Sequence, residues 1–237
     1  MLRNLLLELL PDRERRRIAA HCEDVDLQQR TTLYEPDAAI SHVWFPNTCV
    51  CSTVIHVENG EAVEVGLVGR EGVVGIPIIL GCTSNSFRVI VQIAGKATRI
   101  PRQPFSDIAL APGSVFCTGL LQYANLYLSN VAQTAACNRL HRIDQRLARW
   151  LLDLHDRTQS DALPVTHEFL GLMVGAYRPS VTKALKSFEE RGVLEVRRGA
   201  LHIRSLDALR GQACECHQAL RRRTLQTLDH IRTLAAA

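Results

Sequence analysis

Side chains that can hydrogen-bond to a nucleic acid gather between residues 177 and 186. An arginine such as Arg178 can bridge the O6 and N7 atoms of a guanine, and the methyl group of Thr182 can contact a thymine. Only three lysines occur in the chain, and two of them, Lys183 and Lys186, lie in this segment. The chemistry available here is recognition of DNA, and the alternative is an ordinary solvated helix.

The spacing of apolar residues predicts two short helices that would position these side chains. Thr166 is a suitable N-cap for the first, and Gly175 ends it because glycine accepts the left-handed conformation of a tight turn. The second runs from about residue 178 to residue 191, with Pro179 in its first turn, where proline is tolerated. Its inward face is formed by Val181, Leu185 and Phe188. Such a pair can lay its second helix in the major groove, although a helical hairpin with solvated charges has the same spacing.

A small hairpin is predicted directly after the second helix. Residues 193–198 and 200–204 have the pattern of strands around Gly199, and Arg197 and Arg198 precede that turn. Arginines on such a wing suit phosphate contacts, which position a protein on DNA without reading its sequence. We therefore expect Arg178 to read a base edge and the wing arginines to hold phosphates. The full set of expected DNA contacts is Thr166, His167, Tyr177, Arg178, Pro179, Ser180, Thr182, Lys183, Lys186, Arg197 and Arg198.

A long helix is predicted before this region, over residues 114–138, which contain no proline and one glycine. It is about twice as long as a typical helix. Part of its apolar stripe would extend past the domain that it covers, and a second copy of the helix is the natural cover. The sequence therefore predicts a two-fold homodimer. Its contacts would be made by Leu121, Ala124, Leu128, Val131 and Ala135. A shorter helix is predicted over 144–157, followed by a linker at 159–161.

The first half of the chain has the pattern of a β-rich domain. It begins with a helical segment over the first 22 residues, broken at Pro11. Strands are then predicted at 50–57, 61–65, 73–80, 87–93 and 96–100. A hairpin turn at residues 58–60 would join the first two. Short strands at this spacing favour an antiparallel roll or barrel.

Charge is distributed unevenly along the chain. Residues 1–138 hold 11 basic and 13 acidic side chains, and residues 139–237 hold 17 basic and 11 acidic ones. A basic second half fits a polyanionic partner, but an ordinary solvated surface fits it equally well. No apolar run reaches the roughly 18 residues of a membrane span, and no signal peptide is expected. We therefore predict a cytoplasmic protein without a membrane partner.

The eight cysteines are expected to be reduced thiols, because the chain shows no export signal. Cys214, Cys216 and His217 could contribute to a metal site, but three ligands within four residues strain a single tetrahedral centre. The sequence therefore predicts no metal ligand, and it gives no role to Cys214 and Cys216.

Residues 166–185 resemble the helix-turn-helix of the Crp/Fnr family of bacterial regulators. Gly171, Gly175 and Val181 stand where that motif has a small residue, a turn glycine and a buried aliphatic residue. Residues 192–199 are similar to the family's wing. The resemblance implies a jelly-roll sensor, a dimerisation helix and a winged-helix reader, with double-stranded DNA and RNA polymerase as partners.

The resemblance implies that Arg178 and Lys183 contact DNA. Pro179 stands where some members of the family have an acidic residue that reads a base. Together with the helix and strand pattern, the resemblance predicts an α+β fold. The expected parts are an N-terminal antiparallel β-roll (jelly roll), a long dimerisation helix and a C-terminal winged helix-turn-helix, with domains at 1–140 and 141–237. The expected function is a sequence-specific transcription regulator controlled by an unidentified effector.

A cyclic nucleotide is not expected to be that effector. Family members that bind one place a Gly-Glu pair and an arginine around its phosphate and ribose, whereas the matching segment here reads Gly75, Ile76 and Pro77. Arg88 is the arginine nearby, and we expect it on an outward strand position. A phosphate loses its hydrating water when it binds, and without a cation or several hydrogen-bond donors the protein does not compensate for that loss. No cofactor is predicted, since a lone His or Cys on a strand, such as His42, His56 or Cys82, is usually structural.

Two other classes of function stay open. An enzyme on a cupin-like barrel would need a metal-binding set of residues on strands, and the spacing of the available residues does not provide one. Those residues are His42, His56, Glu61 and Glu64. A partner-binding module that has lost DNA binding is disfavoured by the presence of Arg178, Lys183 and the wing arginines. No catalytic residue is predicted.

Overall fold

The structure is a computed structural model that describes residues 4–58 and 62–236. It divides into two compact units, each made of separate stretches of chain. The first takes residues 1–53, 68–129 and 222–237, and the second takes residues 54–67 and 130–221. The long helix α5 (Val115–Leu140) and the last helix α10 (Cys216–Ala236) contribute to both. Within the described residues, no helix is long and apolar enough to cross a membrane.

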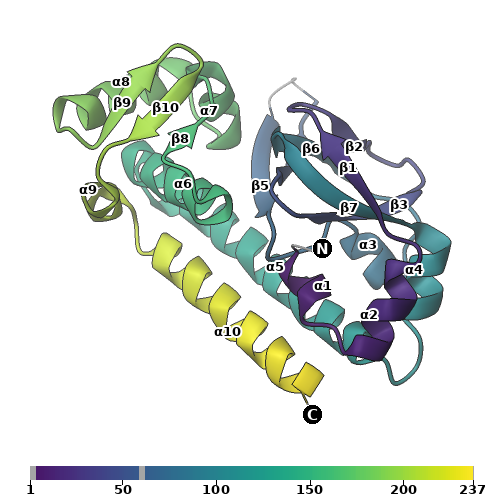
Figure 1. The fold of residues 1–237 in the computed structure, drawn as a ribbon. Coiled ribbons are helices and arrows are strands. Elements are labelled where there is room, and N and C mark those ends of the chain that lie inside the picture. Colours follow the sequence, from purple (N-terminus) through teal and green to yellow (C-terminus); the bar gives the residue numbers. More distant parts are fainter. Residues whose placement is uncertain (1–3, 59–61, 237) are drawn as a thin grey trace. The chain divides into compact units, whose positions relative to one another are not determined.

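Two sheets form the β-rich part of the chain (Figure 1). Their strands are β1 (Glu23–Leu27), β2 (Thr32–Tyr34), β3 (His42–Pro46), β4 (Val50–His56), β5 (Ala62–Val68), β6 (Arg88–Ile93) and β7 (Gly95–Pro101). One sheet has the order β1-β7-β3, with both outer strands antiparallel to β7. The other has the order β2-β6-β4-β5, with β2 antiparallel to β6. The predicted antiparallel β-rich architecture is confirmed.

Four of the five predicted strands are also confirmed, since β4, β5, β6 and β7 cover the expected segments. The turn expected at 58–60 falls largely on residues 59–61, which lie outside the described residues. Strands β1, β2 and β3 were not predicted, because their short and mixed sequences carry little alternation.

The strand predicted at residues 73–80 is wrong. Val74 makes an isolated bridge with Trp44, and the chain then enters the short helix α3 (Ile76–Ile79). Gly75 takes a φ of +149°, which a residue with a side chain rarely adopts. Pro77 lies in the first helical turn, where its missing N–H has no partner to lose. A continuous apolar run fits a buried strand or a buried helix, so its pattern could not distinguish them.

Helices cover the core of the first unit. They include α1 (Leu5–Glu8), α2 (Asp12–Ala19) and α4 (Arg102–Ala109), the first two matching the predicted N-terminal helix broken at Pro11. Phe45, Phe105 and Phe116 meet in the core with ring centroids 6.1 to 6.3 Å apart. These rings come from β3, α4 and α5, so they pack the sheet against the two helices.

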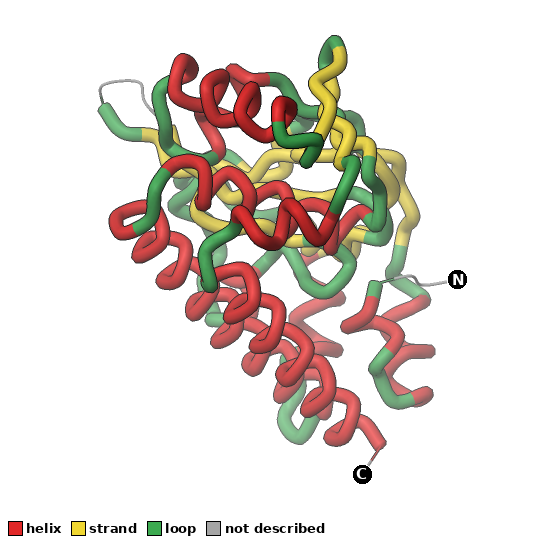
Figure 2. Tube along the Cα trace, turned by 90° about the vertical axis from the view of Figure 1, so that its left-hand side faces the viewer, coloured by secondary structure: helices red, strands yellow, loops and turns green. Residues whose placement is uncertain are grey.

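The end of α10 packs on the beginning of α5, as Figures 1 and 2 illustrate. Leu228 and Ile231 of α10 are buried in the core of the first unit. Gly119 makes room for this contact, since a Cβ there would lie 3.2 Å from Ile231 Cγ2. A helix that sequence analysis did not predict therefore covers part of α5 within the same chain.

The second unit contains the predicted winged helix-turn-helix. Its elements are α6 (Ile143–Thr158), β8 (Ala162–Leu163), α7 (His167–Met173), α8 (Arg178–Glu190), β9 (Leu194–Arg197), β10 (Ala200–Ile203) and α9 (Leu206–Gln212). The three strands form a sheet of order β8-β10-β9, in which β9 and β10 are the expected hairpin. The predicted helix pair and the hairpin that follows it are confirmed.

Candidate nucleic-acid interface

The turn between α7 and α8 depends on residues that leave room for the backbone. Thr166 caps α7, its Oγ1 accepting a hydrogen bond from Phe169 N at 3.3 Å. Gly175 takes the left-handed conformation, with φ of +57°. At Gly171 a Cβ would lie 3.0 Å from Ala176 O, because the turn folds back over the helix there. These contacts fix the angle at which α8 leaves the turn.

Helix α8 has one buried face and one exposed face. Val181, Leu185 and Phe188 are fully buried, each with 0% exposure. Burying three such side chains contributes about 5–9 kcal/mol, at roughly 1.5–3 kcal/mol each. This anchorage leaves Arg178 and Lys183 on the exposed side of the same helix.

The expected DNA contacts lie on the surface, with one exception. Ten of the eleven side chains are exposed, namely Thr166, Tyr177, Arg178, Pro179, Ser180, Thr182, Lys183, Lys186, Arg197 and Arg198. His167 is half-buried, and its Nδ1 lies 3.3 Å from Thr182 Oγ1. This contact joins the start of α7 to the exposed face of α8, so His167 supports that face.

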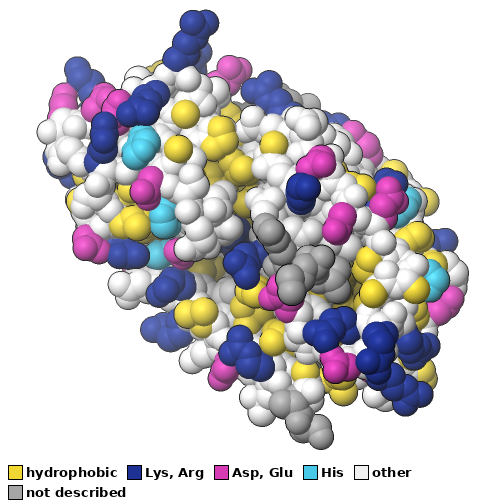
Figure 3. Space-filling model, viewed as in Figure 1, with side chains coloured by type: hydrophobic (Ala, Val, Ile, Leu, Met, Phe, Trp, Pro, Cys, Tyr) yellow, Lys and Arg dark blue, Asp and Glu magenta, His cyan; other side chains and the backbone are white. Residues whose placement is uncertain are grey.

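Three of these cations are free of internal ion pairs. In the part of the chain that the structure describes, Arg178, Lys183 and Arg198 form no salt bridge. Figure 3 shows Lys and Arg side chains, mixed with Asp and Glu, on the surface formed by α8 and the hairpin of β9 and β10. Lys186 lies near an acidic residue, its Nζ 3.9 Å from Glu190 Oε1, and both side chains are exposed. Exposed unpaired cations remain available to phosphates and base edges.

Arg197 differs from Arg198 in having an internal partner. Its Nε donates to Glu195 Oε1 at 2.8 Å and its Nη2 to Glu195 Oε2 at 3.3 Å. Arg204 pairs with the same carboxylate. The hydrogen bonds from Arg197 and Arg204 lower the pKa of Glu195 to about 2. The two wing arginines were expected to be equivalent, but much of the charge of Arg197 is already balanced.

The residues considered for a phosphate site in the first unit do not form one. Arg88 is half-buried, and its Nε donates to Glu35 Oε2 at 2.8 Å. Ile76 and Pro77 belong to α3, and the amide of Asn85 donates to Phe87 O. None of these groups offers a free cation to a phosphate.

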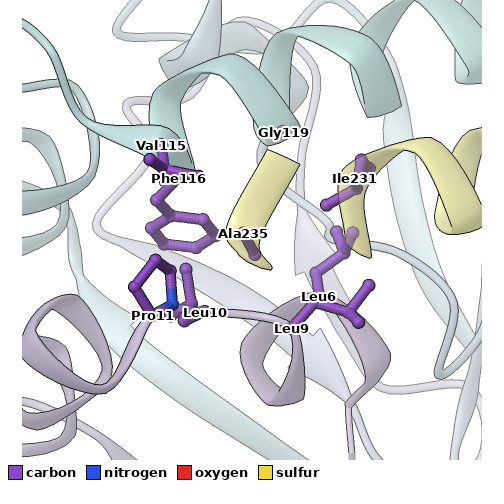
Figure 4. Close-up of a pocket in the computed structure, with 9 residues that line it drawn as sticks. All are labelled: Leu6, Leu9, Leu10, Pro11, Val115, Phe116, Gly119, Ile231 and Ala235. Atoms are coloured by element: carbon purple, nitrogen blue, oxygen red, sulfur yellow. The ribbon is translucent and has the colours of Figure 1, made fainter. Parts of the chain in front are cut away.

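A small apolar pocket lies in the same unit (Figure 4). It is lined by Leu6, Leu9, Leu10, Pro11, Val115, Phe116, Gly119, Ile231 and Ala235. Among these lining residues, none has a charged or hydrogen-bonding side chain. The pocket therefore has no group suited to an anion.

The residues considered for a cupin-like metal site are not brought together. Glu64 is buried and accepts a hydrogen bond from Trp150 Nε1 at 2.8 Å. Within the described residues, His42, His56 and Glu64 form no group of metal ligands. Glu61, the fourth residue considered, lies outside the described residues. Glu64 instead satisfies the indole of a fully buried tryptophan.

Comparison with known proteins gives the second unit a family match. Residues 145–211 match the Crp-like helix-turn-helix domain. No curated protein matches the chain in sequence. The matched region contains α7, α8 and the hairpin of β9 and β10.

Solved structures extend the similarity to most of the chain. FixK2 from Bradyrhizobium japonicum is 14% identical, with a TM-score of 0.68 over 81% of this chain and 98% of that one. A CRP/FNR-family transcriptional regulator from Thermus thermophilus is 19% identical, with a TM-score of 0.66 over 81% and 98%. A CRP-family regulator from the same organism is 17% identical, with a TM-score of 0.66 over 80% and 96%. The chain therefore has the fold of these regulators and carries a Crp-like DNA-binding domain.

Proposed function

We propose that this chain, with its Crp-like helix-turn-helix domain on a Crp/Fnr-type fold, is a sequence-specific transcription regulator that binds double-stranded DNA as a homodimer. The observation that carries the proposal is the exposed face at the start of α8, where Arg178 and Lys183 have no ion-pair partner among the described residues. A helix held by Val181, Leu185 and Phe188 can enter the major groove with this face toward the bases. Arg178 then reads a guanine, and Lys183 contacts DNA beside it.

The dimer surface that we propose is a stripe along α5. Its seven exposed residues are spaced by three and four positions, as on one side of a helix. They are Thr118, Leu121, Asn125, Leu128, Ala132, Ala135 and Arg139. The stripe includes three of the expected dimer contacts, Leu121, Leu128 and Ala135.

Two expected dimer contacts have other positions. Ala124 is buried in the core of its own chain, so it cannot contact a partner there, and we leave it out of the dimer surface. Val131 is half-buried and borders the stripe.

The rest of the proposal concerns the role of each half of the chain and the place where the protein acts. We assign effector sensing to residues 1–140 and DNA reading to residues 141–237. We propose that the protein works in the cytoplasm and regulates RNA polymerase at promoters. An enzyme on the β-rich part is less well supported, because Glu64 is engaged by Trp150.

Selection of bound DNA from a random pool tests the function directly. The full chain should enrich one sequence made of two inverted half-sites, with centres about one helical turn apart. Footprinting on that sequence should give two-fold symmetric protection. Enrichment of no sequence above the input pool would contradict a sequence-specific regulator, and enrichment of a single half-site would contradict the dimer.

The wing arginines are expected to differ in their contribution to DNA affinity. Arg198→Ala should weaken binding to the selected and a scrambled duplex equally and reduce the salt slope by about 0.9 for each protomer of the dimer, as for one lost phosphate contact per half-site. Arg197→Ala should have less than half that effect, because Glu195 already balances this guanidinium. Titrations at several salt concentrations measure both slopes. A larger change for Arg197→Ala would refute the assignment.

Neither cAMP nor cGMP is expected to bind at micromolar concentrations. The segment that would hold the phosphate carries Ile76 and Pro77, and Arg88 is paired with Glu35. A desolvated phosphate there would lack compensation. Isothermal calorimetry on the full chain should give only the heat of dilution, with injections into buffer as the control. A saturable isotherm for either nucleotide would show that the first unit contains a phosphate site of another kind.

A further inference from the structure

Four side chains with metal-binding atoms converge in the second unit. They are Cys137, His141, Cys214 and Cys216, and their ligand atoms all lie within 4.8 Å of one another. The Sγ atoms of Cys137 and Cys214 are 3.5 Å apart, and Cys216 Sγ lies 3.7 Å from His141 Nδ1. The three cysteines are buried, and His141 is half-buried. The cluster therefore has a single centre, shielded from most of the solvent.

The chain reaches this centre from two places. Cys137 and His141 are one helical turn apart at the end of α5, where His141 N donates to Cys137 O at 3.1 Å. Cys214 lies in the turn between α9 and α10, and Cys216 is the first residue of α10. Three ligands within four residues would strain a tetrahedral centre. Here each of the two segments supplies only two ligands, so that strain does not arise.

His217, which the sequence suggested as a ligand, points elsewhere. Its Nε2 lies 3.0 Å from Asp156 Oδ2, in a pair that is largely buried on the histidine side. His141 takes its place beside the cysteines.

The distances fit one tetrahedral ion. Zinc–sulfur bonds of about 2.3 Å and zinc–nitrogen bonds of about 2.0–2.1 Å put two thiolates about 3.8 Å apart, and a thiolate and an imidazole about 3.6 Å apart. The Cys137–Cys214 and Cys216–His141 pairs, at 3.5 and 3.7 Å, are close to those edges. Three cysteines and one histidine are a known donor set of structural zinc sites. An iron–sulfur cluster spreads its ligands over several irons, which fits this common centre less well.

Neighbouring side chains orient two of the four donors. His141 Nε2 lies 3.1 Å from Glu215 Oε1, and a carboxylate in that position holds the proton on Nε2 and leaves Nδ1 free to bind. Gln133 Nε2 donates to Cys216 Sγ at 3.2 Å. Arg146 and Arg149 both interact electrostatically with Cys137. Their charges oppose the net negative charge of one Zn²⁺ with three thiolates.

We propose that Cys137, His141, Cys214 and Cys216 bind one zinc ion. The ligands lie just before and just after the matched domain at residues 145–211, so the ion joins the two ends of the DNA-binding domain. Binding releases the protons of the three thiols and leaves the histidine neutral. Neither the fold similarity nor the DNA-binding proposal is needed for this assignment.

Metal analysis of the full chain, purified under reducing conditions, tests the site. We expect one zinc per chain, and replacement by Co²⁺ should give the visible bands of tetrahedral cobalt with thiolate-to-cobalt charge transfer. Cys214→Ser should lower zinc affinity by more than about 100-fold, and Glu215→Gln, which only orients His141, by about 10- to 100-fold. Cys82→Ser, at an exposed cysteine, and His217→Gln are the matched controls and should keep both zinc and spectrum.

Each other outcome would overturn the assignment. Reduced wild-type chain that takes up neither zinc nor cobalt would exclude the site, even if a variant failed to fold. Full zinc content in Cys214→Ser would place the ion elsewhere. A chain without metal that forms a Cys137–Cys214 disulfide on mild oxidation would make this pair a redox couple instead.

Discussion

Arg178→Ala is expected to cost about 1–3 kcal/mol per half-site of the selected DNA, or roughly a 5- to 150-fold rise in Kd for each half-site. Arg178 stands exposed at the first position of α8 and forms no salt bridge in the described part of the chain. An arginine there can donate to both O6 and N7 of a guanine, and alanine leaves both acceptors unpaired. The loss should be specific, because the scrambled duplex offers no such guanine in register.

Titration of both duplexes at fixed salt measures this specificity. Arg178→Ala should relax the preference at one position per half-site when selection from a random pool is repeated. Arg210→Ala is the matched control, because this exposed arginine lies on α9 and pairs with Asp207 at 2.7 Å. It should bind both duplexes as the wild type does. If Arg178→Ala weakened binding to both duplexes equally, Arg178 would be a phosphate contact and the base-reading residue would lie elsewhere on α8.

The helix-turn-helix could be predicted from the sequence because its determinants are local. Thr166 accepts from a backbone N–H three residues later, and Gly175 takes its conformation within a single turn. The burial of Val181, Leu185 and Phe188 follows from helical spacing alone. Each of these signals lies within a few residues of the element that it defines.

Contacts between distant residues could not be predicted in the same way. Cys137 and Cys214 are separated by 77 positions, so no spacing rule joins them. His217, which is adjacent to Cys216 in sequence, pairs with Asp156 instead. The pair of Arg197 and Glu195 also depends on the structure, because the hairpin brings Arg204 to the same carboxylate. Apolar and charged patterns give residue types, whereas partners depend on how the elements pack.

Helix α5 illustrates a limit of periodicity itself. Leu120, Tyr123 and Ala124 of α5 are buried in their own core, while the neighbouring stripe through Leu121 and Leu128 is exposed. The two stripes lie beside each other on one helix and are similarly apolar. Composition therefore could not show that Ala124, an expected dimer contact, belongs to the buried stripe rather than the exposed one.

Leu128→Glu is expected to dissociate the homodimer. Leu128 is 67% exposed in the single chain and lies in the middle of the proposed stripe on α5. In a two-fold dimer the substitution would bury two like charges close to the axis. Desolvating each charge costs several kcal/mol, so the dimer dissociation constant should rise by more than about 100-fold. The melting temperature of the monomer should change little, because the side chain is exposed there.

Leu225→Glu is the matched control, because it places the same charge at an exposed leucine of the other long helix, α10. Leu225 lies on α10 and is 55% exposed, so the same charge is added at a comparable site outside the proposed interface. Sedimentation at micromolar concentration should give a dimer mass for the wild type and Leu225→Glu, and a monomer mass for Leu128→Glu. Binding to the two-half-site DNA should fall with the dimer, since each half-site alone offers half of the contacts. A dimer that survives Leu128→Glu but dissociates in Leu225→Glu would place the interface on α10, and a monomeric wild type would refute the stripe altogether.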